Sequence, residues 1–405
     1  MKPLNILIFV GKFPQLSESF IIRKVYGLAN NGYNVKVLSR RKGDLKILKS
    51  FGPLPKNVKI DWAIPDYDFY NFQTILKTLY YFIFFPKKTL YIIKNVYNLS
   101  KSYSIRNWIK YLSFIDKKNF EIIHFEFLGF ASTYEMIFHL FPEKKIFISC
   151  RGADIHLLDL KDKEYKQKVI KFLHKVHFIH VVSNEIKNIL VEKYISEDKK
   201  IFINRPAIAL NKNDIDIQKV QRSEYLRLVA VGRLEWKKGF DYLLAALHIL
   251  KNKDIKFYLE IIGDGSLKAE LLFSISDLGL ENNVKLCGAL PNSEVIKKLY
   301  QADIFILSSC EEGISNAVLE AMALKKAVIS TNVGGMNEVI QSGKNGILVP
   351  PRNPKSLADS IEYLISNPDI RERLGIEASK TIERDFTIDR QINIFDKYYK
   401  IALND

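Results

Sequence analysis

The sequence has few cysteines and no long apolar segment. Its three cysteines, Cys150, Cys287 and Cys310, show neither the paired spacing of a disulfide framework nor the spacing of a zinc site. We therefore expect free thiols in a reducing compartment, the cytosol. No segment approaches the ~20 apolar residues of a membrane-spanning helix. The apolar run at residues 4–10 is too short for the core of a secretion signal, so we expect it to form the first strand.

Acidic residues are scarce in the first half of the chain. The net charge is +16, and residues 1–210 hold 35 Lys and Arg against 18 Asp and Glu, which gives +17. The remaining residues, 211–405, hold 26 against 27, which gives −1. Basic residues are densest over residues 71–120, where nine of them stand beside Asp116 as the single acid.

Aromatic residues are interleaved with these basic residues, as in residues 79–85, Leu-Tyr-Tyr-Phe-Ile-Phe-Phe. A basic, aromatic-rich amphipathic region is typical of a contact with an anionic membrane surface. We favour this partner, with the rings of Tyr80, Tyr81 and Phe84 inserted among the lipids. Helices that pack on the core and expose a solvated basic face are the alternative. Nucleic acid is a third possibility, which we set aside because no recognised nucleic-acid-binding module accompanies the charge.

A length of 405 residues predicts two domains. Strand-like apolar runs alternate with helical patterns along the whole chain, which favours parallel sheets built from βαβ units. A polar stretch at residues 211–216 marks the boundary. The expected parts are an N-terminal domain over 1–208, a linker over 209–225, a second domain over 226–385, and a last helical segment over 386–405 that crosses back to the first domain.

The most informative segment is residues 311–323, Glu-Glu-Gly-Ile-Ser-Asn-Ala-Val-Leu-Glu-Ala-Met-Ala, which follows an apolar run and enters strong helix formers. Glu312 and Glu320 are eight positions apart, roughly 12 Å along a helix axis. This distance suits the two ends of one extended ligand and is too long for a single metal. Backbone N–H groups at the helix start, a favourable seat for phosphate, come from Gly313, Ile314, Ser315 and Asn316. The pattern fits a nucleotide-sugar; an ordinary strand-to-helix connection with a solvated acidic face is the alternative.

A second segment offers cations for a diphosphate. Residues 232–239, Gly-Arg-Leu-Glu-Trp-Lys-Lys-Gly, follow another apolar run. Gly232 allows a sharp turn at the carboxyl end of the expected strand, where ligand sites of α/β proteins lie. Arg233 and Lys238 then project two cations toward the ligand. A basic surface turn without function is the alternative for residues 232–239. Gly263 is expected in a turn after the next strand.

These segments resemble the donor-binding motifs of the group 1 retaining glycosyltransferases. The resemblance covers nearly the whole chain and is strongest over residues 226–350. It implies the GT-B fold, an α/β architecture of two Rossmann-like parallel-sheet domains facing a cleft, with the donor in the C-terminal domain and the acceptor in the N-terminal one. It further implies that Arg233 and Lys238 bind the donor diphosphate in place of a metal. Glu320 would then hold the ribose, and Glu312 the hydroxyls of the donor sugar.

In the N-terminal half, residues 13–21 resemble an element of exopolysaccharide glycosyltransferases of the colanic-acid type. Ser17 is expected as a helix N-cap and Glu18 in the first turn, both on the acceptor side, with helix capping alone as the alternative. At residues 149–155 many relatives carry a His-Gly pair that faces the transfer site. Arg151 occupies the His position here, and because an Arg cannot act as a base, we expect it to position substrate or stabilise charge.

Further candidates for the acceptor side surround Arg151. Asp154 is expected to orient Arg151 or to bind acceptor hydroxyls, with a purely structural turn as the alternative. His124 and Glu126 stand at the end of an apolar run, where the acceptor should bind. We expect no metal site, because three evenly spaced histidines span a helix end and a strand and would not converge: His174, His177 and His180. No cofactor is expected besides the nucleotide-sugar, which is a substrate.

The sequence therefore predicts a retaining, metal-independent glycosyltransferase. It would move a sugar from a UDP- or GDP-sugar to a hydroxyl of a lipid-linked saccharide, in exopolysaccharide or lipopolysaccharide biosynthesis at the inner membrane face. No carboxylate pair suited to double displacement is evident, so we favour front-face transfer. The expected catalytic residues are Arg233, Lys238, Glu312 and Arg151. The alternatives are a GT-B nucleotide-sugar epimerase and a non-catalytic protein that binds membranes or polyanions.

Overall fold

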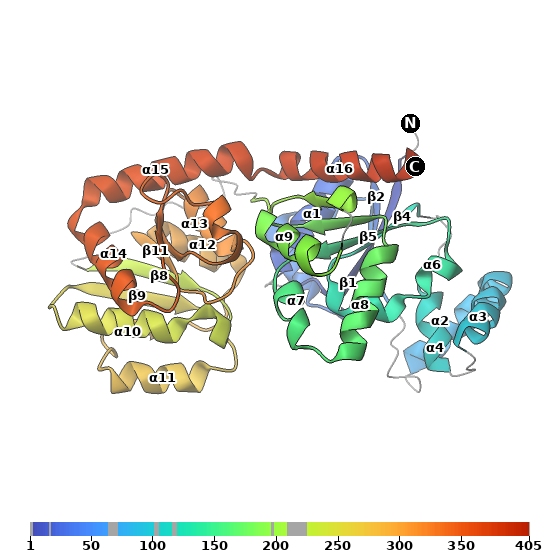
Figure 1. Ribbon diagram of the computed structural model, residues 1–405, viewed down its shortest axis with the longest axis horizontal. Coiled ribbons are helices and arrows are strands. Elements are labelled where there is room, and N and C mark those ends of the chain that lie inside the picture. Colours follow the sequence, from blue (N-terminus) through green and yellow to red (C-terminus); the bar gives the residue numbers. More distant parts are fainter. Residues whose placement is uncertain are drawn as a thin grey trace. The chain divides into compact units, whose positions relative to one another are not determined.

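A computed structural model describes residues 3–15, 18–63, 72–100, 105–115, 120–195, 198–208 and 225–404. The chain divides into two compact units (Figure 1). The first contains Met1–Val181, Lys187–Asn204 and Ile392–Asp405, and the second contains Val182–Ile186 and Arg205–Gln391. No single cut in the sequence separates the units, because each includes a short segment from the other's part of the chain.

The first unit is built on a seven-stranded sheet in the order β3-β2-β1-β4-β5-β6-β7, and all its described strand pairs are parallel. Its strands are β1 (Asn5–Phe13), β2 (Asn34–Lys42), β3 (Val58–Trp62), β4 (Ile122–Phe125), β5 (Lys145–Cys150), β6 (Phe178–Val181) and β7 (Ile201–Ile203). Residues 6–10 of β1 are all buried. Such continuous apolar strands form because helices cover both faces of a parallel sheet.

The helices of the first unit fall into two groups. The helices packed around the sheet are α1 (Ser19–Asn30), α5 (Leu128–Ala131), α6 (Ile137–Leu140), α7 (Ala153–His156), α8 (Lys163–Lys175) and α9 (Asn184–Lys193), whose first turn belongs to the second unit. A separate group beside the sheet consists of α2 (Phe72–Phe84), α3 (Pro86–Ser100) and α4 (Ile105–Leu112) (Figure 1).

The second unit has a six-stranded sheet in the order β10-β9-β8-β11-β12-β13, again parallel in every described pair. Its strands are β8 (Leu226–Val231), β9 (Phe257–Ile262), β10 (Val284–Leu286), β11 (Ile304–Leu307), β12 (Ala327–Thr331) and β13 (Ile347–Val349). Its helices are α10 (Phe240–Lys251), α11 (Lys268–Asp277), α12 (Asn292–Gln301), α13 (Asn316–Ala323), α14 (Pro354–Ser366) and α15 (Pro368–Asp385). Two parallel-sheet units confirm the predicted α/β class.

Glu338 ties the segment Val182–Ile186 to the second unit. Its Oε1 accepts a hydrogen bond from Asn184 N at 2.6 Å, and its Oε2 accepts one from Arg205 Nη2 at 2.6 Å. A carboxylate at the backbone N–H of a helix's first residue stabilises the helix start. Glu338 therefore caps α9, which lies far from it in the sequence.

Helix α16 (Ile388–Asn404) passes from the second unit to the first. Ile392, Phe395 and Tyr399 are buried on one face of the helix, three and four residues apart. The Tyr399 ring packs edge-on against Phe147 of β5, with 4.9 Å between ring centroids. The end of α16 is therefore part of the core of the first unit. Among the described residues, no helix combines the length and apolar character needed to cross a bilayer.

Candidate active site

Four loops meet at the carboxyl edge of the second sheet. They follow β8, β9, β11 and β12 and span residues 232–239, 263–267, 308–315 and 332–335. Backbone hydrogen bonds join them: Cys310 N donates to Lys237 O at 2.8 Å, and Gly335 N donates to Gly313 O at 2.8 Å. Because parallel strands end at a common edge, this loop cluster brings together side chains that are distant in sequence.

Lys238 and Glu312 form an ion pair in the loop cluster. The two side chains are only 14% and 16% exposed. Ser309 Oγ donates to the same carboxylate oxygen of Glu312 at 3.2 Å, and Ser308 Oγ donates to the Lys238 carbonyl at 2.9 Å. The two residues predicted to bind the diphosphate and the donor sugar are therefore direct neighbours, so a ligand there would meet an ammonium and a carboxylate side by side.

Arg233 lies on the exposed side of the same cluster. Its side chain is 57% exposed, and its Nη1 pairs with Glu235 Oε1 at 3.0 Å. Lys237 Nζ approaches the other oxygen of Glu235 at 3.4 Å. Exposed ion pairs contribute only about 0–1 kcal/mol. The Arg233 guanidinium can therefore leave Glu235 for an anionic ligand at little cost.

Two glycines fix the shape of the loop cluster. Gly334 has φ +55°, and a Cβ at this position would lie 1.7 Å from the Glu312 carbonyl oxygen. Gly263 has φ +148°, and a Cβ there would lie 1.8 Å from the Gly232 carbonyl oxygen. Glycine alone accommodates both the positive φ and the close contact. Gly263 thus supports the turn at Gly232, and Gly334 supports the segment that carries Glu312.

Helix α13 begins in the segment that the sequence singled out. Ser315 stands at the N-cap position without a side-chain capping hydrogen bond, and Glu320 is buried within the helix. The expected separation of roughly 12 Å between Glu312 and Glu320 assumed helix over the whole interval. Because the helix starts at Asn316, helical rise covers only about half of that interval.

Polar atoms at the start of α13 are buried without a hydrogen-bond partner among the described residues. These atoms are Asn316 Oδ1 and Glu311 Oε1. Gly313 and Ile314, between them in sequence, are buried as well. Buried polar groups in native proteins are nearly always paired. An unpaired acceptor at Asn316 therefore suits a hydroxyl or N–H donor of a ligand.

A second polar cluster lies at the carboxyl ends of β4 and β5 in the first unit. Glu126 is fully buried; its Oε1 pairs with Lys24 Nζ of α1 at 2.5 Å, and its Oε2 pairs with Arg151 Nη2 at 2.5 Å. The Arg151 guanidinium also lies over the Phe20 ring, 4.2 Å from its centroid. Glu126 and Phe20 together orient Arg151.

His124 and His180 extend this cluster into the core. His124 Nε2 lies 2.8 Å from Ser149 Oγ, and His124 Nδ1 lies 2.7 Å from the Tyr399 hydroxyl of α16. Ser149 Oγ lies 2.8 Å from His180 Nδ1, and His180 Nε2 lies 2.7 Å from the Asn204 carbonyl oxygen. Every ring nitrogen of both histidines thus has a protein partner, so they act as structural groups. Among the described residues, no group of three or more His, Cys, Asp or Glu side chains could hold a metal ion.

Burial sets the protonation states of this cluster. Burial lowers the pKa of Lys24 to about 8, although the Glu126 carboxylate opposes this shift. Burial would raise the pKa of Glu126, but the Lys24 ammonium and the Arg151 guanidinium hold it well below its usual range. Burial also lowers the pKa of both His124 and His180 well below the usual value, reinforced by the nearby cations. At neutral pH the carboxylate is therefore ionised and both imidazoles are neutral.

Asp154 holds the backbone of the turn that carries Arg151. Its Oδ1 accepts hydrogen bonds from Arg151 N at 3.1 Å and from Gly152 N at 3.0 Å. The sequence interpretation expected Asp154 to orient Arg151 or to bind acceptor hydroxyls; in the structure Asp154 holds the Arg151 backbone, while Glu126 and Phe20 contact the Arg151 side chain. Burial raises the pKa of Asp154 against these backbone donors, and its Oδ2 has no partner among the described residues.

The remaining acceptor candidates lie at the start of α1. Ser17 is outside the described residues. Helix α1 begins at Ser19, and Glu18 occupies the N-cap position without a side-chain capping bond. The cap therefore falls one residue later than the sequence predicted.

The loop cluster lies within a segment of the chain that matches a known protein family. Residues 211–381 match the family described as Glycosyl transferases group 1. This part of the chain is a group 1 glycosyltransferase domain. The amylovoran biosynthesis glycosyltransferase AmsK of Erwinia amylovora is 27% identical over 88% of this chain and 89% of its own length. The putative colanic acid biosynthesis glycosyltransferase WcaL of Salmonella typhimurium is 33% identical over 41% of this chain and 44% of its own length.

Solved structures share the fold along the whole chain. A glycosyltransferase from Rickettsia africae matches with a TM-score of 0.72 at 21% identity, covering 100% of both chains. HepE of Anabaena, solved with UDP-glucose, matches with a TM-score of 0.71 at 15% identity, covering 97% of this chain and 99% of HepE. The chain therefore has the GT-B fold, as the sequence predicted.

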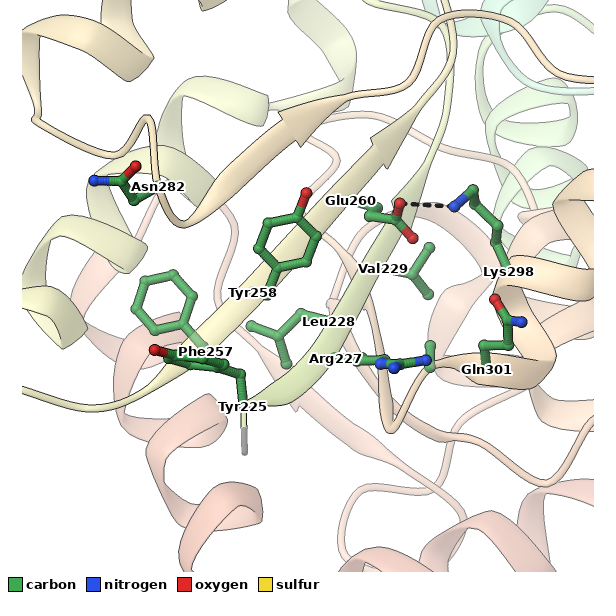
Figure 2. Close-up of a pocket in the computed structure, with 11 residues that line it drawn as sticks. Tyr225, Arg227, Leu228, Val229, Phe257, Tyr258, Glu260, Asn282, Lys298 and Gln301 are labelled. Atoms are coloured by element: carbon green, nitrogen blue, oxygen red, sulfur yellow. Dashed lines mark hydrogen bonds and ion pairs between the residues drawn. The ribbon is translucent and has the colours of Figure 1, made fainter. Parts of the chain in front are cut away.

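A cavity of the second unit lies away from the loop cluster. A cavity of about 420 Å³ lies at the amino ends of β8 and β9 (Figure 2). Glu260 and Lys298 pair there at 2.7 Å, near Arg227 and Tyr258. Because the loop cluster occupies the carboxyl ends of the same strands, this cavity is separate from the candidate active site.

Sequence reasoning missed Lys24, Ser149 and Tyr399 in the first unit of this glycosyltransferase. A signal existed for Lys24, which stands three residues after Ile21 and four before Leu28, on the apolar face of a helix. Tyr399 carried no local signal, because its partner His124 is 275 positions away.

Proposed function

We propose that this protein is a retaining glycosyltransferase that moves a sugar from a UDP- or GDP-sugar to a hydroxyl of a lipid-linked saccharide. The product would be a repeating unit of a surface polysaccharide, exopolysaccharide or lipopolysaccharide, made at the cytoplasmic face of the membrane. The observation that carries the proposal is the Lys238–Glu312 pair beside the exposed Arg233 and the start of α13.

The chemistry of the loop cluster supports a nucleotide-sugar donor. Two cations suit a diphosphate, and a carboxylate suits sugar hydroxyls. The Glu312 carboxylate would turn from Lys238 toward the sugar while Lys238 binds phosphate, and Arg233 would leave Glu235 for the same phosphate. Glu320 is buried on α13 and Asn316 Oδ1 is buried at its start, and both would bind ribose hydroxyls. HepE, of the same fold, has been solved in complex with UDP-glucose.

The transfer step would proceed on one face of the donor sugar. The bond between the anomeric carbon and the diphosphate breaks as the acceptor oxygen bonds to that carbon from the same side. The acceptor proton passes to the departing diphosphate oxygen, and Arg233 and Lys238 stabilise the negative charge there, a role worth roughly 100-fold or more in rate per group. This scheme retains the anomeric configuration and needs no metal.

The polar cluster of the first unit supports an acceptor that carries negative charge. Arg151 is held by Glu126 and Phe20, and its Nε is buried without a hydrogen-bond partner among the described residues. A fixed guanidinium with a spare donor suits a phosphate oxygen of a lipid pyrophosphate. The names of AmsK and WcaL, both biosynthetic enzymes of extracellular polysaccharides, favour an acceptor of this kind.

The test is a panel of labelled UDP- and GDP-sugars with a lipid-linked saccharide extract, in which released nucleoside diphosphate and labelled lipid are measured. We expect one donor to transfer its sugar with the same anomeric configuration, and excess EDTA to leave the rate unchanged. Lys238→Ala should lose at least ~100-fold in turnover. The matched control, Lys237→Ala, removes a neighbouring lysine whose ion pair among the described residues is with Glu235, and this variant should keep its activity.

Three results would reject the proposal in different ways. A sugar altered in configuration but still attached to its nucleotide would identify an epimerase. No binding of any nucleotide-sugar would identify a non-catalytic protein. A product of inverted anomeric configuration, or a strict need for Mn²⁺ or Mg²⁺, would retain the enzyme class but exclude the mechanism.

A further inference from the structure

Helix α2 presents a continuous apolar stripe to solvent. Six of its large apolar side chains are between 45% and 71% exposed: Phe72, Ile75, Leu76, Leu79, Ile83 and Phe84. The first five recur at helical spacing, with Ile75 and Leu76 on adjacent positions, so these five form a stripe along one face of the helix. Thr74 and Tyr81, on the opposite face, are only 4% and 3% exposed. The helix is therefore packed on the protein by its less apolar face, and the more apolar face lacks protein cover among the described residues.

The following helix adds positive charge and further exposed rings. Residues 72–100, which form α2, α3 and their junction, contain four lysines and no Asp or Glu. Lys77 pairs with Asp61 at 2.7 Å. Lys87, Lys88 and Lys94 are exposed and form no ion pair among the described residues. The two helices thus combine an apolar stripe with unpaired cations.

The joint between the helices is fixed rather than loose. Thr89 is fully buried, and its Oγ1 donates to the Tyr81 carbonyl oxygen at 3.0 Å. The Tyr81 ring packs against Phe85, the residue between the two helices, with 6.1 Å between centroids. The stripe and the lysines are therefore carried by one rigid hairpin, which Figure 1 shows beside the sheet of the first unit.

We propose that α2 lies in the headgroup layer of an anionic bilayer, with its apolar stripe among the acyl chains and Lys87, Lys88 and Lys94 on lipid phosphates. A helix of this type binds membranes through buried apolar area and attraction to anionic lipid. This membrane contact would bring the enzyme to a lipid-linked acceptor, and only that purpose rests on the proposed function.

Charge distinguishes a lipid surface from a second copy of this chain. Two copies that meet through α2 and α3 would bring lysines against lysines, with no carboxylate in either hairpin to balance them. An anionic bilayer supplies both an apolar layer for the stripe and phosphates for the lysines. The surface therefore favours lipid over self-association.

The structure also changes which residues insert. The sequence interpretation assigned Tyr80, Tyr81 and Phe84 to the membrane; Tyr81 is buried on the protein side, whereas Tyr80 and Phe84 are 40% and 57% exposed. The stripe adds residues one and two turns earlier, around Leu76 and Leu79. Because apolar insertion is not screened by salt, the protein should stay partly bound at high ionic strength, unlike one held by charge alone.

The test is co-sedimentation of the full chain with vesicles of phosphatidylcholine alone or mixed with phosphatidylglycerol, without any sugar substrate. We expect binding to the anionic vesicles. Replacing the stripe by glutamine (Leu76→Gln, Leu79→Gln and Ile83→Gln together) should weaken binding on the order of 100-fold, since each half-inserted side chain supplies about fivefold. The reversal Lys87→Glu with Lys88→Glu should weaken it roughly 30-fold, about fivefold for each lost lysine.

Matched controls come from the second unit, where exposed residues of the same types lie on other helices and loops. Leu272→Gln with Phe273→Gln on α11 removes two exposed apolar side chains, and Lys344→Glu with Lys355→Glu reverses two exposed lysines. Both control variants should bind vesicles like the wild type.

Equal binding of the stripe variant and the wild type would overturn the proposal. So would a wild type that binds anionic vesicles no better than neutral ones, or that sediments as a dimer dissociated by the stripe substitutions. The failure of the proposed function is visible separately: a protein that binds vesicles in this pattern but transfers no sugar supports the membrane contact and rejects the enzyme.

Discussion

The buried histidines of the first unit predict a specific loss of stability in mild acid. Burial holds the pKa values of His124 and His180 well below the ordinary 6.5. The unfolded chain therefore binds more protons than the folded chain at any pH below about 6.5, and the free energy of unfolding falls as the pH drops. Each histidine contributes up to about 1.4 kcal/mol per pH unit. Between about pH 7.5 and pH 5.5 the pair should cost about 2.7 kcal/mol.

The other charged groups around these histidines titrate outside this range. The depressed pKa of Glu126 stabilises the fold above about 4.5, the unfolded value, and this contribution is lost only at lower pH. The pKa of Lys24 is lowered to about 8, so most of its charge change lies above the range, and the part below pH 7.5 changes the free energy of unfolding in the same direction as the histidines. His177 adds a smaller effect of the same sign, because burial lowers its pKa too.

The measurement can be confined to the first unit. The chain has three tryptophans, of which Trp62 and Trp108 lie in the first unit and Trp236 in the second. In a Trp236→Phe background, fluorescence during urea unfolding reports on the first unit alone, which avoids treating a two-unit chain as one transition. The free energy of unfolding should drop by about 2.7 kcal/mol between the two pH values.

A substitution separates the histidines from other causes. His124→Gln keeps a side chain that can bond to Ser149 and the Tyr399 hydroxyl, and it should halve the acid loss. His174→Gln, at an exposed position, should leave the loss unchanged. The reasoning is refuted if the wild type is equally stable at both pH values, or if His124→Gln loses as much as the wild type.

Three further predictions concern the proposed site. Glu320→Gln should weaken binding of the free nucleoside diphosphate about 10-fold or more, the scale of one charge-assisted hydrogen bond; equal affinities by calorimetry would remove Glu320 from the ribose site. Gly334→Ala should abolish most transfer, because the new Cβ displaces the Glu312 carbonyl. The control Gly343→Ala, at φ +82° but with open space around it, should stay active. Equal activities of the two variants would show that the close contact at Gly334 is unimportant. Phe20→Leu should lower turnover a few-fold by removing the cation–π contact with Arg151, worth about 0.5–2 kcal/mol. The control Phe273→Leu, at an exposed position on α11, should leave turnover unchanged. Unchanged turnover in both variants would argue against a role for Arg151.

The sequence predicted the strands near the site well because they are buried on both faces. The apolar runs at Ile122–Phe125 and Ile304–Leu307 are strands in the structure, each followed by the polar residues expected at its end. The helix after the second run was also predicted, but its first residue was not. Gly313 to Ser315 form a loop that depends on Gly334, a residue contributed by the next strand's connection.

Contacts between distant segments account for what the sequence could not predict. Glu312 and Lys238 were each recognised, yet their ion pair depends on the lateral order of β8 and β11, which no local pattern encodes. The hairpin of α2 and α3 shows a different limit. Composition identified the region, but only the packing of α2 decides that Tyr81 faces inward and Leu79 outward.

The division of α16 between the units has a consequence for biosynthesis. Residues 392–404 reach the ribosome exit after all of residues 205–391, yet they supply Phe395 and Tyr399 to the core of the first unit. Until these residues emerge, His124 lacks its contact with the Tyr399 hydroxyl. Domains usually fold in the order of their synthesis. Here every residue of the second unit precedes residue 392, so this unit can complete its core first, and the first unit, although mostly translated earlier, finishes last.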